Sequence, residues 1–367
     1  MMYQVKQHMK LHFWLLSLIT IAAGCMAQPS LDKEVDSLAR SFIKEKHAIG
    51  LSVGVLKDGK TYFYGYGETE KGNGRAPGPT TLFEIGSISK TFTATLLGMA
   101  VVTGKVSLDD TVNKYLPDSI PLLQFDGRVI TLKDLSNHTS GLPRMPSNFY
   151  DPVVDLQDPY RAYSIEKLYQ FLAHVKLSRK PGSRYEYSNL AAGLLGVILG
   201  KMYNLSYEEL ILQYICGPLD MHDTRIIIRK EDSASFAKGY DLGGNYTSYW
   251  NLSPAFAGAG AIRSTVRDML KYAQANLGEV TGVLGKAIQL THEQTFSQEA
   301  VTLGLGWHYI QPGEEKVLFH NGGTGGFRTY LAIHPGKKFA VVMLANAAIS
   351  VDKEGNELMR WLEKKNG

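Results

Sequence analysis

The chain has 367 residues, of which 44% are hydrophobic and 20% are charged, and its formal net charge at pH 7 is +4. This near balance lacks the strong basic excess that binding a nucleic acid requires, so no nucleic-acid partner is expected. The length exceeds that of a usual single domain but is too short to require three domains, which favours one unit built of two lobes.

Residues 1–27 have the composition of a secretory signal peptide. Residues 1–10 carry two lysines and no acid, and the apolar run over 11–24 is about fourteen residues long, short of the ~20 that a membrane-spanning helix needs. Cleavage after Ala27 would release a soluble product, whereas Cys25, which follows Ala-Ala-Gly, could carry a lipid anchor. We expect export to the periplasm or the medium, with the soluble product favoured over the lipoprotein.

The remaining chain places strands at both ends and helices in the middle. In chain order, we expect a helix over 31–42, a hairpin over 50–56 and 61–66, mainly helical structure over 91–290, strands over 327–334 and 339–345, and a helix over 357–362. Asp58-Gly59 is a strong signal for the turn of the first hairpin, and Pro335-Gly336 marks the turn of the last.

Hairpins at both ends imply one antiparallel sheet that is assembled from both ends of the chain and flanked by helices. The expected fold class is therefore α+β. Residues 28–367 would form a single domain, with a sheet lobe of about 28–90 and 295–367 and an inserted, mainly helical lobe of about 91–294. A ligand site is expected in the cleft between the two lobes.

One turn of this chain places a nucleophile beside a base. Ser87 and Lys90 are three residues apart, so on a helix both side chains lie on one face. A serine hydroxyl becomes a strong nucleophile when a neighbouring amine takes its proton, which requires the lysine pKa to fall below its usual ~10.4. Burial and nearby positive charge both lower a lysine pKa. Ser87 and Lys90 are therefore candidate catalytic residues.

The Ser-x-x-Lys spacing alone is a weak signal, because most such pairs lie on solvated helix surfaces. The same spacing occurs at Ser30/Lys33, Ser41/Lys44, Ser164/Lys167, Ser235/Lys238 and Ser350/Lys353. Only around Ser87 are both flanks apolar and small, with Phe83, Ile85 and Gly86 before it and an apolar run to Ala100 after it. This context predicts a buried helix and selects Ser87.

A second candidate motif is Tyr187-Ser188-Asn189, which precedes a helix of small residues. Side chains two apart in an extended segment point the same way, so the Tyr187 phenol and the Asn189 amide can enter one cleft. Tyr249-Trp250-Asn251 repeats the pattern, and either tyrosine could instead be packed at a lobe surface. Only the first copy lies in a tight turn that enters an apolar helix, so it is preferred.

The third motif is His320-Asn321-Gly322-Gly323, which is followed closely by two more glycines. Glycines at a strand edge let a substrate backbone approach, and the Gly323 N–H could face the Ser87 N–H across a carbonyl oxygen as an oxyanion hole. A plain glycine-rich loop with one histidine is the alternative. No His-x-His or His-Glu-x-x-His pattern accompanies His320, and the glycines over 258–260 fit no nucleotide fingerprint, so no metal or other cofactor is expected.

Taken together, the three motifs resemble those of the class C β-lactamase and penicillin-binding serine hydrolase family, in which Ser-x-x-Lys is a known signature. The resemblance runs from about Ile49 to the C-terminus and includes the stretches 136–143, 258–269 and 342–346. It implies a β-lactamase/transpeptidase-like fold. The loop over 141–146 is similar to that of the branch with D-alanyl-D-alanine carboxypeptidase and endopeptidase activity.

The resemblance also implies a role for each candidate residue. Ser87 would be the acylated nucleophile, and Lys90 and Tyr187 would share the general base and acid work. Asn189 would hydrogen-bond the substrate amide, and the N–H groups of Ser87 and Gly323 would form the oxyanion hole.

The third motif departs from the family, which has Lys-Thr-Gly where this chain has His320-Asn321-Gly322. The family lysine helps to hold a substrate carboxylate. A histidine with a pKa near its usual ~6.5 should do so weakly at neutral pH and more strongly on acidification. Arg328, two residues beyond the glycines, could supply the missing charge.

The leading interpretation is an exported serine hydrolase that is acylated by D-Ala-D-Ala peptides of peptidoglycan or by small-molecule β-lactams, with peptides and small esters turned over better than β-lactams. An esterase or D-amino-acid amidase on the same site is the second interpretation. A penicillin sensor that acylates without turnover is the third. No Gly-x-Ser-x-Gly elbow frames a serine, which argues against an α/β-hydrolase.

We predict that export removes residues 1–27, because a basic start, a short apolar run and small residues precede Gln28. Mass spectrometry of the exported protein should find an N-terminus at Gln28. A lipid-modified Cys25 would establish the anchored form instead, and a mature N-terminus at Met1 would contradict both.

Overall fold

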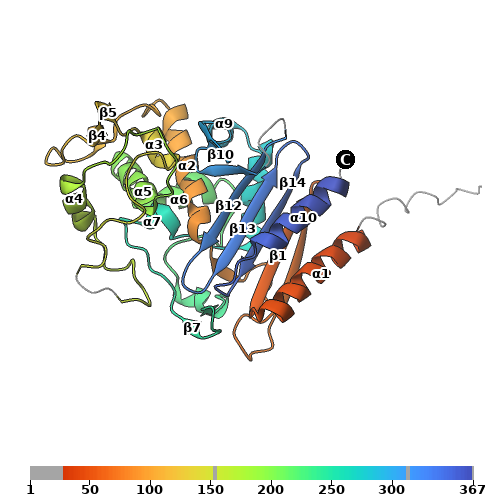
Figure 1. Ribbon diagram of the computed structural model, residues 1–367. Helices are drawn as coiled ribbons and strands as arrows, with labels where there is room; N and C mark the ends of the chain where they lie inside the picture. Colours follow the sequence, from red (N-terminus) through yellow and green to blue (C-terminus); the bar gives the residue numbers. More distant parts are fainter. Residues whose placement is uncertain (1–27, 152–154, 311–314, 366–367) are drawn as a thin grey trace, which may run out of the picture.

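The structure is a computed structural model that describes residues 28–151, 155–310 and 315–365 (Figure 1). The expected signal peptide and Cys25 lie outside these residues. No helix within the described part of the chain combines the length and the apolar character needed to cross a bilayer.

The described residues form one antiparallel sheet of eight strands, in the order β2-β1-β14-β13-β12-β11-β10-β9 (Figure 1). The N-terminal hairpin pairs directly with the last strand, with Leu51 opposite Ala345. The expected α+β fold, with an antiparallel sheet built from both chain ends, is confirmed. The strands are β1 (Gly50–Lys57), β2 (Lys60–Gly67), β9 (Phe296–Gln298), β10 (Val301–Gly304), β11 (Trp307–Ile310), β12 (Val317–Gly323), β13 (Arg328–His334) and β14 (Phe339–Ala345).

Helices cover both faces of this sheet. One face carries α1 (Gln28–Lys46) and α10 (Asp352–Lys365), which lie in front of the sheet in Figure 1. The other described helices are α2 (Ser89–Val102), α3 (Leu132–Ser136), α4 (Ile165–His174), α5 (Asn189–Tyr203), α6 (Tyr207–Ile211), α7 (Ala257–Gly260), α8 (Val266–Gln274) and α9 (Gly282–Thr291). Three short strand pairs lie outside the large sheet: β3 (Leu82–Glu84) with β8 (Arg263–Thr265), β4 (Gln124–Phe125) with β5 (Arg128–Val129), and β6 (Gly239–Tyr240) with β7 (Tyr246–Thr247).

The central strands are buried on both faces and serve two hydrophobic cores. Along β14, Val341 and Met343 belong to the core beneath α1 and α10, whereas Val342 and Leu344 belong to the core shared with the other helices. This alternation follows from the period of two in a strand, which turns successive side chains to opposite faces. Both faces are covered, so β14 is one continuous apolar run.

Helix α8 packs on the second face of the sheet, although its residues lie within 91–294, the range expected for the helical lobe. Val266, Met269, Leu270 and Ala273 are buried at helical spacing and give α8 one apolar stripe. At Gly54 of β1, an added Cβ would lie 2.6 Å from Val266 and 3.0 Å from Leu270. Glycine at this position therefore lets the helix lie close to the sheet.

Helix α2 runs through the centre of the helical region and is buried from Ser89 to Ala100. It packs on α5, α7 and α9, and Phe92 stacks on Tyr272 with 4.1 Å between ring centroids. The polar side chains along this stretch, such as Thr91, Thr93 and Thr95, donate to backbone carbonyl oxygens, so the helix can be buried on all sides. The buried helix predicted after Ser87 is therefore confirmed, and its burial holds the start of α2 in one position.

The end of β12 packs against the backbone that precedes α2. At Gly322, an added Cβ would lie 2.0 Å from the Ile85 carbonyl oxygen and 2.3 Å from Thr329 Oγ1, and the Thr329 hydroxyl donates to that same oxygen at 2.9 Å. Both contacts are with groups held in place by the sheet or the buried core. Glycine at this position sets the distance between the sheet and the start of α2.

We predict that Gly322→Ala lowers the free energy of unfolding by about 1–3 kcal/mol, because its methyl group must push β12 away from Ile85. The matched control is Gly78→Ala, since an added Cβ at Gly78 meets no atom within 4 Å. The control should stay within about 0.5 kcal/mol of the wild type in denaturant unfolding. Equal effects of the two substitutions would contradict the packing argument.

Candidate active site

Ser87 lies in a short 3-10 turn, Gly86–Ile88, which leads directly into α2. Gly86 has a positive φ of 53°, and an added Cβ there would lie 2.7 Å from the Gly323 backbone nitrogen. Both observations call for glycine. The turn presents Ser87 beside the end of β12, and the helix itself begins two residues later than the serine.

The Lys90 amine is buried, with 3% of the residue exposed, and meets three acceptors. Its Nζ lies 2.6 Å from the Ala259 carbonyl oxygen, 3.0 Å from Asn189 Oδ1 and 2.9 Å from Ser87 Oγ. Burial lowers the Lys90 pKa well below its usual value, and the nearby charge of Arg144 lowers it further. A neutral amine would donate its two N–H bonds to the carbonyl oxygens and turn its lone pair to the Ser87 hydroxyl.

The Tyr187 ring lies against this amine, with Lys90 Nζ 4.8 Å from the ring centroid. Burial raises the Tyr187 pKa, an effect that the Ser87 hydroxyl partly offsets. The phenol is therefore protonated at neutral pH and can donate a proton. The two groups beside Ser87 have opposite pKa shifts, which is the pattern of an assigned base and an assigned acid.

The Tyr187-Ser188-Asn189 segment is fixed to the loop that contains His138 and Arg144. The Ser188 N–H donates to His138 Nδ1 at 3.1 Å, and the Ser188 hydroxyl donates to the Pro143 carbonyl oxygen at 2.7 Å. The Asn189 N–H donates to the Arg144 carbonyl oxygen at 3.1 Å. Ser188 also caps α5. These bonds turn both Tyr187 and Asn189 toward Ser87.

The tyrosine of the other Tyr-x-Asn copy is partly buried and packs against other aromatic rings. Tyr249 stacks on Phe236 with ring centroids 4.0 Å apart, and Phe327 lies beside both rings. The interpretation of this copy as a packed tyrosine is confirmed. Trp250, the residue that follows, lines the cleft.

His320 is buried, with 2% of the residue exposed, and lies behind the surface of the cleft. Its Nδ1 lies 2.6 Å from the Asn321 carbonyl oxygen, and its ring centroid lies 5.4 Å from that of His308. Burial lowers the His320 pKa well below its usual value, and the charges of His308 and Lys90 lower it further. The expected strengthening of carboxylate binding by His320 on mild acidification is therefore wrong, because the ring stays neutral there.

Gly325 and Gly326, the last two glycines after His320, pack tightly against other segments of the protein. An added Cβ would lie 2.8 Å from the Trp250 indole nitrogen at Gly325, and 2.6 Å from the Gly239 Cα at Gly326. The interpretation that these two glycines make room for a substrate is therefore wrong. Gly322 and Gly323 do line the cleft, and there Arg328 lies against Gly323.

A cleft of about 530 Å³ brings most of the candidate residues together. Its lining consists of Ser87, Arg144, Tyr160, Tyr185, Tyr187, Asn189, Trp250, Asn321, Gly322, Gly323, Thr324, Arg328, Thr329, Ser350 and Asp352. Sequence reasoning did not identify Arg144, Tyr160, Trp250 or Asp352. Of these four residues, only Arg144 could have been suspected from the sequence, because it lies in the loop 141–146 that resembles a loop of the family. A second groove of about 710 Å³ has Pro143, Met145 and Glu186 in its lining, and Ser87 is not part of it.

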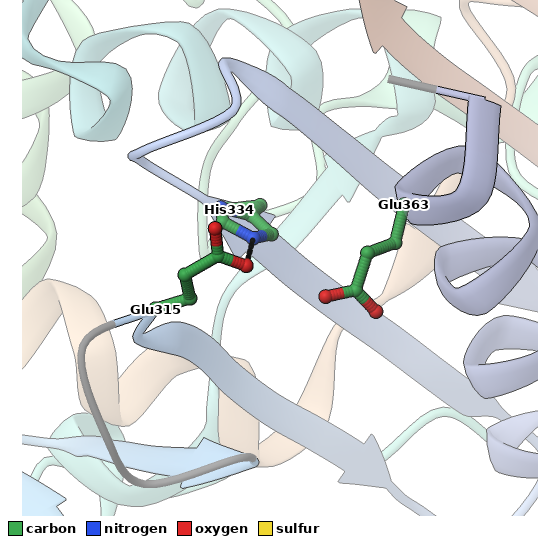
Figure 2. A group of neighbouring side chains, drawn as sticks. All are labelled: Glu315, His334 and Glu363. Carbon is green, nitrogen blue, oxygen red and sulfur yellow. Dashed lines mark ion pairs between the residues drawn. The ribbon is translucent and has the colours of Figure 1, made fainter. Parts of the chain in front are cut away.

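Among the described residues, one group of side chains could be considered for a metal: Glu315, His334 and Glu363, whose ligand atoms lie within 4.8 Å of one another (Figure 2). His334 Nδ1 accepts the Lys337 backbone N–H at 3.1 Å, so the neutral ring carries its proton on Nε2 and offers no lone pair there. Lys337 Nζ already lies 3.4 Å from Glu315 and 4.0 Å from Glu363. The group is an ion-pair network that connects β13 with α10.

Comparison with known proteins identifies the family of this chain. The Beta-lactamase family model matches residues 35–363. A Beta-lactamase of Pseudomonas fluorescens is 30% identical over 85% of this chain and 92% of its own length. The D-alanyl-D-alanine-carboxypeptidase/endopeptidase AmpH of Escherichia coli K12 is 30% identical over 87% of this chain and 86% of its own length.

Solved structures show the same relationship. A class C beta-lactamase in complex with cefoxitin superposes with a TM-score of 0.81 at 28% identity, covering 92% of this chain and all of the other, 100%. The D-alanine carboxypeptidase AmpC from Burkholderia cenocepacia superposes with a TM-score of 0.79 at 28% identity, covering 91% of this chain and 99% of its own. The chain therefore belongs to the Beta-lactamase family and is a serine hydrolase.

Proposed function

We propose that this protein cleaves the amide bonds of D-Ala-D-Ala-type peptides, and more slowly those of β-lactams, through a covalent acyl-enzyme on Ser87. The observation that carries the proposal is the Lys90 amine, which lies 2.9 Å from Ser87 Oγ in a site that lowers its pKa. The D-alanyl-D-alanine-carboxypeptidase/endopeptidase and D-alanine carboxypeptidase among the similar proteins support the substrate class. We also propose that residues 1–27 direct export and that 28–367 act as one catalytic domain outside the cytoplasm.

In the acylation step, the neutral Lys90 amine takes the proton of Ser87 Oγ while that oxygen attacks the carbonyl carbon of the substrate. Ser87 and Gly323 both line the cleft, and in this proposal their backbone N–H groups stabilise the oxyanion that forms. The Tyr187 phenol gives its proton to the leaving nitrogen, and the proton held by Lys90 restores the phenol. The carbon–nitrogen bond breaks and the acyl group stays on Ser87.

Deacylation uses the same groups, with water in place of Ser87 as the nucleophile. Water loses a proton to the Lys90 amine and attacks the ester carbonyl carbon of the acyl-enzyme. The oxyanion that forms is stabilised by the same backbone N–H groups as in acylation. The ester bond breaks, Ser87 regains its proton, and the free carboxylic acid leaves. Asn189 holds the amine of Lys90 through Oδ1 and lines the cleft, so it also lies within reach of the substrate amide.

We predict that a fluorescent penicillin labels Ser87 covalently and that Ser87→Ala loses the label. Ser164→Ala is the matched control, because Ser164 also precedes a lysine by three residues but caps α4 away from the cleft. Lys90→Ala and Tyr187→Phe should each slow labelling about a hundredfold or more, the usual effect of losing a positioned acid or base. Labelled Ser87→Ala protein would move the nucleophile elsewhere.

We also predict that the acylation rate depends on pH through Lys90. The amine is an effective base only after it loses a proton, so the rate rises with pH through the Lys90 pKa, well below 10.5. Arg144→Gln removes a positive charge that disfavours protonated Lys90, so the rise should move to higher pH.

The measurement is a pH–rate profile of acylation with a neutral short-chain ester, so that no substrate charge contributes. Arg161→Gln is the control, because Arg161 is an exposed cation outside the cleft lining. The profile should move with Arg144→Gln and stay in place with Arg161→Gln. A profile that is unchanged in both variants would show that solvent screens the charge of Arg144 from Lys90.

A further inference from the structure

If the protein has the proposed function, the cleft beside Tyr187 must accommodate the carboxylate of the leaving residue. When a peptide ends in free D-alanine, the leaving residue carries its carboxylate on the carbon attached to the scissile nitrogen. The carboxylate carbon is therefore only about 2.5 Å from the atom that receives the Tyr187 proton. A cation that binds this carboxylate must lie close to the Tyr187 ring.

Two of the basic groups in this region are already engaged. The Lys90 amine is buried behind Ser87 with its three acceptors. Arg328 Nη1 donates to the carbonyl oxygens of Thr324 at 2.6 Å and Phe327 at 2.8 Å, and its side chain lies against Gly323. Arg328 therefore holds the backbone that follows β12, and burial lowers its pKa.

The sheet side of the cleft also ends in a negative charge. Asp352, the first residue of α10, lines the cleft and accepts a hydrogen bond from Asn321 Nδ2 at 2.9 Å. A carboxylate placed beside Asp352 would be repelled by it, and the Arg328 cation on the same side offsets only part of that charge because its Nη1 already binds two carbonyl oxygens. His320, behind the same side, is neutral and buried.

Arg144 differs from these groups. Its guanidinium carbon lies 5.0 Å from the centroid of the Tyr187 ring, and its exposed side chain lines the cleft. Its carbonyl oxygen accepts the N–H groups of Asn189 and Leu190, which anchors its backbone to the start of α5. Among the described residues, no hydrogen bond or ion pair engages its guanidinium. The fork of N–H donors is thus open to a ligand beside the proposed acid.

We propose that the Arg144 guanidinium binds the C-terminal carboxylate of the leaving residue. The substrate class that follows is a peptide that ends in a free D-amino acid, which makes the enzyme a carboxypeptidase in preference to an endopeptidase. A chain that continues beyond the leaving residue has an amide at this position, which offers no charge to the guanidinium fork.

The test is equilibrium binding to the inactive Ser87→Ala protein by calorimetry, so that it does not depend on turnover. The two probes are an N-acyl-D-alanyl-D-alanine peptide with a free C-terminus and the same peptide with a C-terminal amide. The free acid should bind about tenfold more tightly than the amide, the effect of a charge-assisted contact in a partly exposed cleft. Adding Arg144→Gln should bring this ratio close to one, and Arg144→Lys should restore part of it.

Two further substitutions in the same background separate Arg144 from other charges. Arg161→Gln, outside the cleft lining, should leave the acid-to-amide ratio unchanged, which excludes general attraction by surface charge. Arg328→Gln should leave the preference for the free acid in place. A preference that is lost with Arg328→Gln and kept with Arg144→Gln would overturn the proposal, as would equal or undetectable binding of both peptides to Ser87→Ala.

The outcome is independent of the acyl-enzyme on Ser87. If penicillin fails to label Ser87 but the binding preference depends on Arg144, the carboxylate site stands and the proposed chemistry is wrong. If Ser87 is labelled but the acid and the amide bind equally, the chemistry stands and the carboxylate site is wrong. For the active enzyme, the ratio of kcat/KM for the two peptides should fall with Arg144→Gln in the same proportion as the binding ratio.

Discussion

The arrangement of this protein depends on one buried amine. Lys90 Nζ is held by Ser87 in the turn before α2, by Asn189 at the start of α5 and by Ala259 in α7. Removing an ammonium group from water is costly, and the site provides oxygen acceptors without a carboxylate among them. The lysine is therefore driven toward its neutral form. Burying the Lys90 amine among these acceptors requires α2, α5 and α7 to pack together. This packing explains why α2 is buried along most of its length.

The sheet provides the opposite side of the same site. Gly322 and Gly86 allow β12 to approach the turn before α2 so closely that neither position has room for a side chain. The proposed oxyanion-binding side of the cleft is thus positioned by backbone packing at these two glycines. Such rigidity suits a site whose donors have to be in place before charge develops.

The charges around the cleft are distributed unevenly. Lys90 and His320 are both buried, and burial lowers the pKa of each, so His320 adds no positive charge near the Lys90 amine at neutral pH. Arg144 places a positive charge on the helical side of the cleft, and on the sheet side Asp352 places a negative charge near the Arg328 cation. This separation lets the base remain uncharged while the cleft still presents a cation to a substrate. In the proposed function, the chemistry and the recognition of a charged substrate therefore belong to different residues.

The sequence by itself determined those features that depend on neighbours along the chain. Ser87 and Lys90 are within one helical turn, the apolar flanks of this pair predict a buried helix, and hairpin signals at both ends imply a common sheet. The bounds of β9, β10 and β11 could not be read, because strands of three or four residues carry too little alternation. The burial of His320, the position of Arg144 over the Tyr187 ring and the packing of Trp250 were decided only by the tertiary structure. Each of these depends on contacts between segments distant in sequence, whose distance and orientation no local pattern records.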